Sequence, residues 1–310
     1  MLADSLRFQR PTNAKPETVS GHCRTPQQHR HKMNKLAFNK TNLDDILTAV
    51  NYYDNFKSNY LNKSFSKINY GNRIGELEFS NLFDAATKYS YSNQVSDEIF
   101  NNWNKVFNNK SSTEEEIFCA VLEVFVWGDV LSGNVKKAIE LYKNKKLSIY
   151  IRKVTDLLTK KEIILKTKNN DPNNDNESEI IWSSGWTKVY SFINNDILIY
   201  DSRVSAFLNH TLTYDIDYNE EQLKELKKLT TYLFNFQGAE NRERLVDKRR
   251  FGFKNSNPSG VNGLNANLVS SWIIELLKDK LKLQEDFRLF ERAFFMLGFD
   301  LKQIKGQDND

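Results

Sequence analysis

The spacing of apolar residues along the chain predicts a mainly helical protein. Between residues 264 and 281, leucines and a tryptophan recur every four residues, which is typical of an amphipathic helix. Thr113 and Glu116 form a capping box ahead of a run that is apolar on nearly all sides, so we predict a buried helix ending near Gly128. The same spacing predicts helices over further segments: 42–60, 96–108, 134–158, 219–236 and 286–297.

Strand signals are few. Alternation of apolar and polar residues is confined to short pieces such as "EIILKT" and "DILIY". No proline lies between Pro26 and Pro172, nor between Pro172 and Pro258, and long stretches without proline allow uninterrupted helices. The expected fold class is therefore all-α.

One segment divides the chain. Residues 166–179, "KTKNNDPNNDNESE", contain no apolar side chain, which predicts a solvated linker. We expect an N-terminal helical lobe over 33–165 and a second lobe over 180–310. Residues 1–32 hold three of the four histidines and three of the five prolines, so we interpret them as a disordered extension outside the fold.

Charge and composition exclude several classes of protein. Residues 1–32 carry six basic and two acidic side chains, which accounts for the whole net charge of +4, so contact with nucleic acid must be local. Two cysteines are too few for a disulfide scaffold or a four-thiolate metal site. No apolar run approaches the roughly 18–20 residues of a membrane span. We expect a cytoplasmic protein that does not contact membranes and needs no cofactor.

The candidate chemistry lies in residues 180–210, directly after the linker. The sequence Ser-Ser-Gly at 183–185 predicts a tight turn, and Thr187 is expected to cap the following helix, with Lys188 in its first turn. An Asn-Asn-Asp sequence ends that helix, and Asp201 is expected to cap the next one. Lys188 and Asp201 should then face the same connecting region, and the turn offers backbone N–H groups to a phosphate.

The sequences "GWTKV" and "IYDSRV" in this segment resemble the helix–hairpin–helix DNA glycosylases of the 8-oxoguanine type. More specifically, the chain is similar to bacterial proteins described as having an 8-oxoguanine glycosylase fold. This resemblance includes "VFVWG" at 124–128, "NANLVSSWII" at 265–274 and "FFMLG" at 294–298. It covers most of residues 100–300 but is specific only over 180–210. The hairpin departs from the family pattern, because a single glycine remains there and the interval from lysine to aspartate is short.

The resemblance implies a bilobed fold with a cleft between the lobes. The family's nucleophilic lysine matches Lys188, and its helix-opening aspartate matches Asp201. It also implies a monomer that acts on double-stranded DNA with a flipped base and has lysine-dependent AP lyase activity. The substrate would be an oxidised purine in base excision repair, or a modified base on foreign DNA in defence against phage.

Chemistry gives Lys188 and Asp201 distinct roles. An amine attacks C1′ of the sugar only when neutral, whereas a free lysine has a pKa of about 10.4. A helix N-terminus and burial both lower the pKa of Lys188, while a nearby carboxylate raises it. Asp201 is therefore expected to stabilise the oxocarbenium-like charge and then to transfer protons. If Lys188 is inert, Asp201 is left to orient a water for simple hydrolysis.

Further residues are candidates for contact with DNA, with Trp186 as a base-stacking side chain: Ser184, Gly185, Trp186, Thr187, Arg203, Arg249, Arg250 and Lys254. The basic run over 242–254 is the best phosphate-binding patch, although a solvated helix face explains it equally well. For Arg203 the alternative to a DNA contact is a structural role, in which it pairs with a carboxylate. Two other functions stay open: a non-catalytic DNA-binding module, and a helical interaction protein in which Lys188 and Asp201 are a surface charge and a cap.

Overall fold

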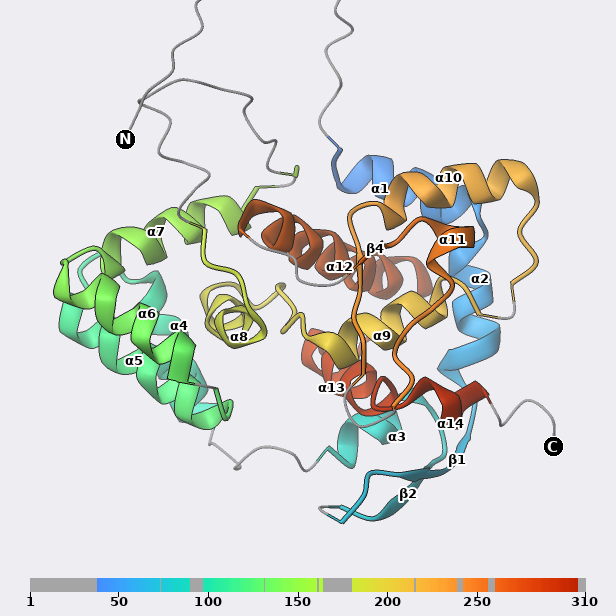
Figure 1. The fold of residues 1–310 in the computed structure, drawn as a ribbon, viewed down its shortest axis with the longest axis horizontal. Helices are drawn as coiled ribbons and strands as arrows, with labels where there is room; N and C mark the ends of the chain where they lie inside the picture. Colours follow the sequence, from blue (N-terminus) through green and yellow to red (C-terminus); the bar gives the residue numbers. More distant parts are fainter. Residues whose placement is uncertain are drawn as a thin grey trace, which may run out of the picture. The chain divides into compact units, whose positions relative to one another are not determined.

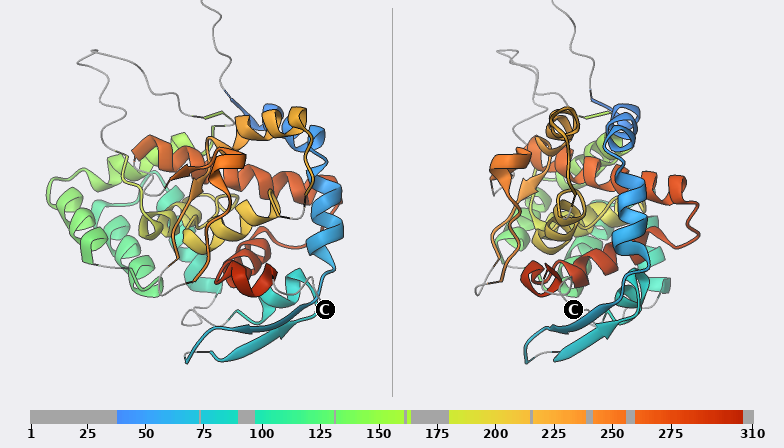
Figure 2. Two further views of the ribbon diagram at one scale, coloured as in Figure 1. Left: turned by 45° about the vertical axis from the view of Figure 1, so that its right-hand side comes forward. Right: turned by 90° about the vertical axis from the view of Figure 1, so that its right-hand side faces the viewer.

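The computed structural model describes residues 38–72, 74–89, 97–130, 132–160, 162–163, 180–214, 216–238, 242–255 and 260–305. The expectations for residues 1–32 and for the linker at 166–179 lie outside these ranges. The described chain is mostly helical, as Figures 1 and 2 show, so the expected class is correct at that level.

The elements follow one another as α1 Lys40–Ala49, α2 Tyr52–Phe56, the π-helix η1 Lys57–Leu61, β1 Phe65–Asn69, β2 Glu76–Phe79, α3 Leu82–Thr87, α4 Asp97–Asn108, α5 Glu114–Trp127, α6 Ser132–Lys143, α7 Leu147–Leu158, α8 Ser184–Ile193, α9 Ser202–Thr211, α10 Glu220–Thr230, β3 Phe234–Asn235, α11 Lys248–Phe251, β4 Lys254–Asn255, α12 Gly260–Leu281, α13 Phe287–Leu297 and α14 Leu301–Lys305. Strands β1 and β2 form an antiparallel hairpin, and β3 and β4 form a two-residue parallel pair. The sequence pattern did not predict either pair.

Helices with clear local end signals lie where the sequence places them. The capping box of Thr113 and Glu116 opens α5, and Gly128 is its C-cap. The predicted helix over 42–60 is instead divided at Asn51, which has a φ of 55°. The helix over 134–158 is likewise divided at Lys145, with a φ of 54°. Both residues adopt the left-handed conformation that ends a helix, which apolar spacing alone does not reveal.

The segment that contains Lys188 and Asp201 lies between two groups of helices. Helix α8 packs on α4, α5 and α7, whereas α9 packs on α13, which in turn packs on α3. Figure 1 shows α8 in this intermediate position. Helix α1 packs on α10 and α12, so contacts cross the boundary expected at residue 165. In the described ranges, no helix combines the length and apolar character that crossing a membrane requires.

Gly298 allows the close contact between α9 and α13. It is the C-cap of α13 but has a φ of −80°, so its conformation does not require glycine. A Cβ atom at this position would lie 1.9 Å from the carbonyl oxygen of Arg203, the second residue of α9. Glycine is needed here because the two backbones touch, and this contact fixes the start of α9.

Candidate functional site

The start of α8 differs from the expected turn. Ser183 is the N-cap, and its hydroxyl accepts a hydrogen bond from the Trp186 backbone N–H at 3.1 Å. The helix therefore begins at Ser184, and Thr187 is an interior residue whose hydroxyl donates to the Ser184 carbonyl at 3.0 Å. The predicted tight turn at 183–185 and the predicted Thr187 cap are both wrong, because Ser183 caps the helix and the helix already begins at Ser184. Lys188 consequently lies in the second turn of α8.

Most of the residues proposed to touch DNA at this turn are buried. Trp186 and Thr187 are fully enclosed, and Gly185 is buried against Val130 and Asn134 of the α6 region. The Trp186 ring meets two aromatic rings edge to face, those of Phe125 and Tyr150, each at 5.5 Å between centroids. Trp186 is thus a core residue and does not stack on a base, and only Ser184 of this group is exposed.

The Lys188 side chain crosses the end of α5. Its Cδ and Cε atoms occupy the space that a Cβ at Gly128 would fill, at 2.2 Å and 2.6 Å. The amine donates a single long hydrogen bond, 3.4 Å to the Ser184 carbonyl. No carboxylate of the described residues lies within ion-pair distance of it. Burial lowers the pKa of Lys188, and the charges of Asp201, Glu291 and Asp129 oppose this change only in part.

Asp201 caps α9 as expected. One carboxylate oxygen, Oδ1, accepts the backbone N–H groups of Arg203 and Val204, both at 2.9 Å. Its second oxygen carries no hydrogen bond within the described chain. Among the carboxylates near Lys188, Asp201 acts most strongly on the lysine charge. The structure therefore brings the two predicted residues into electrostatic contact, with the aspartate fixed by its cap.

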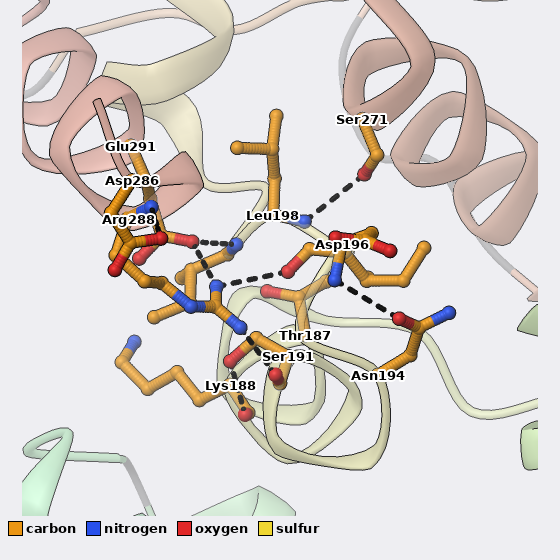
Figure 3. A network of polar contacts seen from close by, with 12 residues as sticks. Thr187, Lys188, Ser191, Asn194, Asp196, Leu198, Ser271, Asp286, Arg288 and Glu291 are labelled. Carbon is orange, nitrogen blue, oxygen red and sulfur yellow. Dashed lines mark hydrogen bonds and ion pairs between the residues drawn. The ribbon is translucent and has the colours of Figure 1, made fainter. Parts of the chain in front are cut away.

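The connection from α8 to α9 is held by Arg288 and Glu291 of α13, as Figure 3 shows. The Arg288 guanidinium donates to the carbonyls of Ser191 and Ile197 and to the Glu291 carboxylate. Buried Glu291 also accepts the Ile199 backbone N–H at 2.7 Å. These contacts fix the relative position of Lys188 and Asp201. Sequence analysis missed both residues, because nothing local links α13 to this segment.

The other predicted DNA contacts divide into two groups. The guanidinium of Arg203 lies over the rings of Phe295 and Phe299, so its packing partners are aromatic rings and differ from the carboxylate partner that we considered. The remaining three are exposed around the short helix α11: Arg249, Arg250 and Lys254. The two phenylalanines between them, at 251 and 253, are buried and anchor this basic surface.

A cavity of about 440 Å³ lies at the opposite end of α9 from Asp201. It is lined by polar residues that include Lys63, His210 and Tyr214. Ten helical residues separate the two ends, which corresponds to about 15 Å. The cavity therefore does not lie beside Lys188 and Asp201.

A comparison with known protein families, curated proteins and solved structures finds no match to this chain. The class of protein that the fold and site define is a mostly helical protein with a partly buried lysine next to a helix-capping aspartate.

Proposed function

We propose that the protein is a DNA glycosylase that excises a damaged or modified base, with Lys188-dependent AP lyase activity. The observation that supports the proposal is the Lys188 amine, which is partly buried, forms no ion pair with a carboxylate of the described residues and lies near the carboxylate of Asp201 that caps α9. Lysines that form Schiff bases are activated by this kind of desolvation. In this proposal the fold is bilobed, its partner is duplex DNA with a flipped base, and the protein acts as a monomer.

In the proposed reaction Lys188 is the nucleophile, and Asp201 first stabilises charge and then transfers a proton. The neutral Lys188 nitrogen forms a bond to C1′ while the glycosidic C–N bond breaks. The electron pair of the glycosidic bond leaves with the base, which takes up a proton. The free oxygen of Asp201 stabilises the positive charge that develops on the sugar. The nitrogen then loses one of its two protons to Asp201, and its electron pair forms the C=N bond as the bond from C1′ to the ring oxygen breaks. The ring oxygen takes that proton back from Asp201, which leaves a protonated imine between Lys188 and the opened sugar.

The experiment that tests the proposal is borohydride trapping on a panel of duplexes containing oxidised purines or modified phage-type bases. Borohydride reduces the imine and leaves a covalent protein–DNA adduct. We expect an adduct and a free base from at least one duplex. Salt-sensitive binding with no base released from any duplex would contradict the proposal and favour a DNA-binding module.

The trapping rate should rise with pH. Burial lowers the pKa of Lys188, so the neutral amine accumulates at lower pH than for an ordinary lysine. The midpoint of the rate profile is expected below the ordinary lysine value of about 10.4. A midpoint at or above that value would show that the amine is not desolvated.

The same shift predicts a stability effect. The folded-state pKa lies below the unfolded one, so the unfolded chain binds more protons between the two values and stability rises with pH there. Lys188→Met should therefore unfold at higher denaturant than wild type at pH 7, with a smaller difference at high pH. Lys136→Met, which changes an exposed lysine of α6, is the control and should show no such dependence.

Gly128→Ala is expected to lower the trapping rate by about 100-fold with little change in stability. The new methyl group would overlap the aliphatic part of the Lys188 side chain, so the amine must move. A displacement of about 1 Å lowers the rate of such a reaction by about 100-fold. The φ of −85° at Gly128 suits alanine, so the backbone is not strained. Gly133→Ala is the matched control, since a Cβ there meets no atom within 4 Å. Equal rates for the two variants would contradict the placement of Lys188.

A further inference from the structure

Three arginines gather around Phe299 at the N-terminal end of α9. The guanidinium carbon of Arg242 lies 4.2 Å from the centroid of the Phe299 ring, and that of Arg203 lies 4.9 Å from it. Arg244 donates from Nε to the Phe299 carbonyl oxygen at 3.2 Å. Three positive charges therefore surround a single buried phenylalanine.

Arg244 is the most enclosed of the three, with 7% of its surface exposed. Its Nη1 donates to the Ser202 hydroxyl at 2.6 Å, but no carboxylate of the described residues lies within ion-pair distance. Burial lowers the pKa of Arg244, and the neighbouring Arg203 lowers it further, although an arginine stays charged at neutral pH. The charges of Asp201 and Asp300 oppose this change without forming an ion pair with Arg244. A buried guanidinium without an ion pair is costly, which points to an anion from outside the chain.

The nearest carboxylates are already engaged. Asp300 accepts the Glu243 backbone N–H at 2.9 Å, and Glu243 forms an ion pair with Lys305. Asp201 uses one oxygen to cap α9. Asp300 and Glu243 are therefore committed to a backbone group and to another cation, whereas Asp201 keeps one oxygen without a hydrogen bond in the described chain.

The segment that carries Arg242 and Arg244 is held at both ends. The Leu301 N–H donates to the Glu243 carbonyl at 2.8 Å. Further along, the Asn235 side chain exchanges two hydrogen bonds with the Val246 backbone, at 2.8 Å and 3.1 Å. The arginines are thus fixed before any ligand arrives, which reduces the entropy lost on binding.

We propose that Arg242, Arg244 and the Ser202 hydroxyl form a phosphate-binding site next to Lys188 and Asp201. The dipole of the ten-residue helix α9 favours an anion at this end, and Arg244 contacts the residue that directly follows Asp201. The site holds the backbone phosphate adjacent to the nucleotide whose sugar reaches Lys188. Its assignment to DNA rests on the proposed glycosylase function, whereas anion binding itself does not.

The first test measures thermal unfolding of the full chain in increasing inorganic phosphate, with sodium chloride at matched ionic strength as reference. Wild type should show a saturable rise in Tm, of roughly 5 °C at 100 times the Kd. Arg244→Met should lose this rise, as should Arg242→Gln, which serves if the first variant does not fold. Arg292→Gln, at an exposed arginine of α13 that belongs to no proposed site, should respond like wild type. No saturable rise in wild type, or an equal rise in Arg242→Gln, would overturn the site.

The second test separates free phosphate from a DNA phosphodiester. Duplexes with an abasic analogue are compared before and after the adjacent phosphate is replaced by an uncharged methylphosphonate. Wild type should lose about tenfold in affinity on this replacement, whereas Arg242→Gln should bind both duplexes equally weakly. A variant that stays as sensitive as wild type would overturn the DNA assignment. A phosphate-dependent Tm without any base release on the panel would refute the glycosylase function and leave the anion site standing.

Discussion

Lys188→Gln is expected to abolish the borohydride-trapped adduct, with a loss of about 1000-fold or more in trapping rate. An amide nitrogen has no available electron pair for attack on C1′, and the amine of Lys188 has no described cationic neighbour on α8 to replace it. The measurement is the yield of adduct with time on the best duplex of the panel. Lys136→Gln, which changes an exposed lysine, should trap as well as wild type.

The loss should not come from unfolding. The Lys188 charge is partly buried and has no ion pair within the described part of the chain, so its removal should leave the free energy of unfolding equal or higher. Base release that survives in Lys188→Gln but is lost in Asp201→Asn would indicate hydrolysis without a Schiff base. A full yield of adduct from Lys188→Gln would refute the role of this lysine.

Trp186→Ala is expected to lower the free energy of unfolding by about 3–5 kcal/mol. The ring is fully buried and packs edge to face on Phe125 and Tyr150, so its removal leaves a cavity between α5, α7 and α8. Chemical denaturation of the purified variant gives the value. Trp186→Phe, which keeps an aromatic ring, should recover a large part of the loss.

The result also distinguishes the two roles considered for this tryptophan. A side chain that stacks on DNA is exposed in the free protein, and its truncation usually changes stability by less than about 0.5 kcal/mol. A small stability change with a large loss of DNA affinity would therefore contradict the buried position of Trp186.

Local sequence signals predicted the helix ends at which they lie. Thr113 and Glu116 opened α5, and Asp201 opened α9, because a capping side chain bonds amides within three residues of itself. The divisions at Asn51 and Lys145 were not predictable in this way, because their left-handed conformations follow from how the flanking helices pack. The position of the α8 cap was missed by four residues, because both Ser183 and Thr187 suit a cap.

Only two residues of the candidate site, both from one segment of the chain, were predictable from the sequence. Lys188 and Asp201 lie thirteen positions apart in the chain, and their pattern was recognisable. The residues that set their chemistry come from elsewhere: Gly128 from the end of α5, Glu291 from α13, and Arg244 from the segment before α11. Sequence spacing carries no information on contacts of this range.

The sequence alone determined that the chain is helical, that Asp201 caps a helix and that a lysine precedes it at a fixed interval. Only the tertiary structure decided that Trp186 is buried, that Lys188 lies in a desolvated position and that Arg244 is buried without an ion pair among the described residues. The physical reason is that caps and helical periodicity depend on neighbours within a few residues. Burial and electrostatic environment depend on side chains that distant helices bring together.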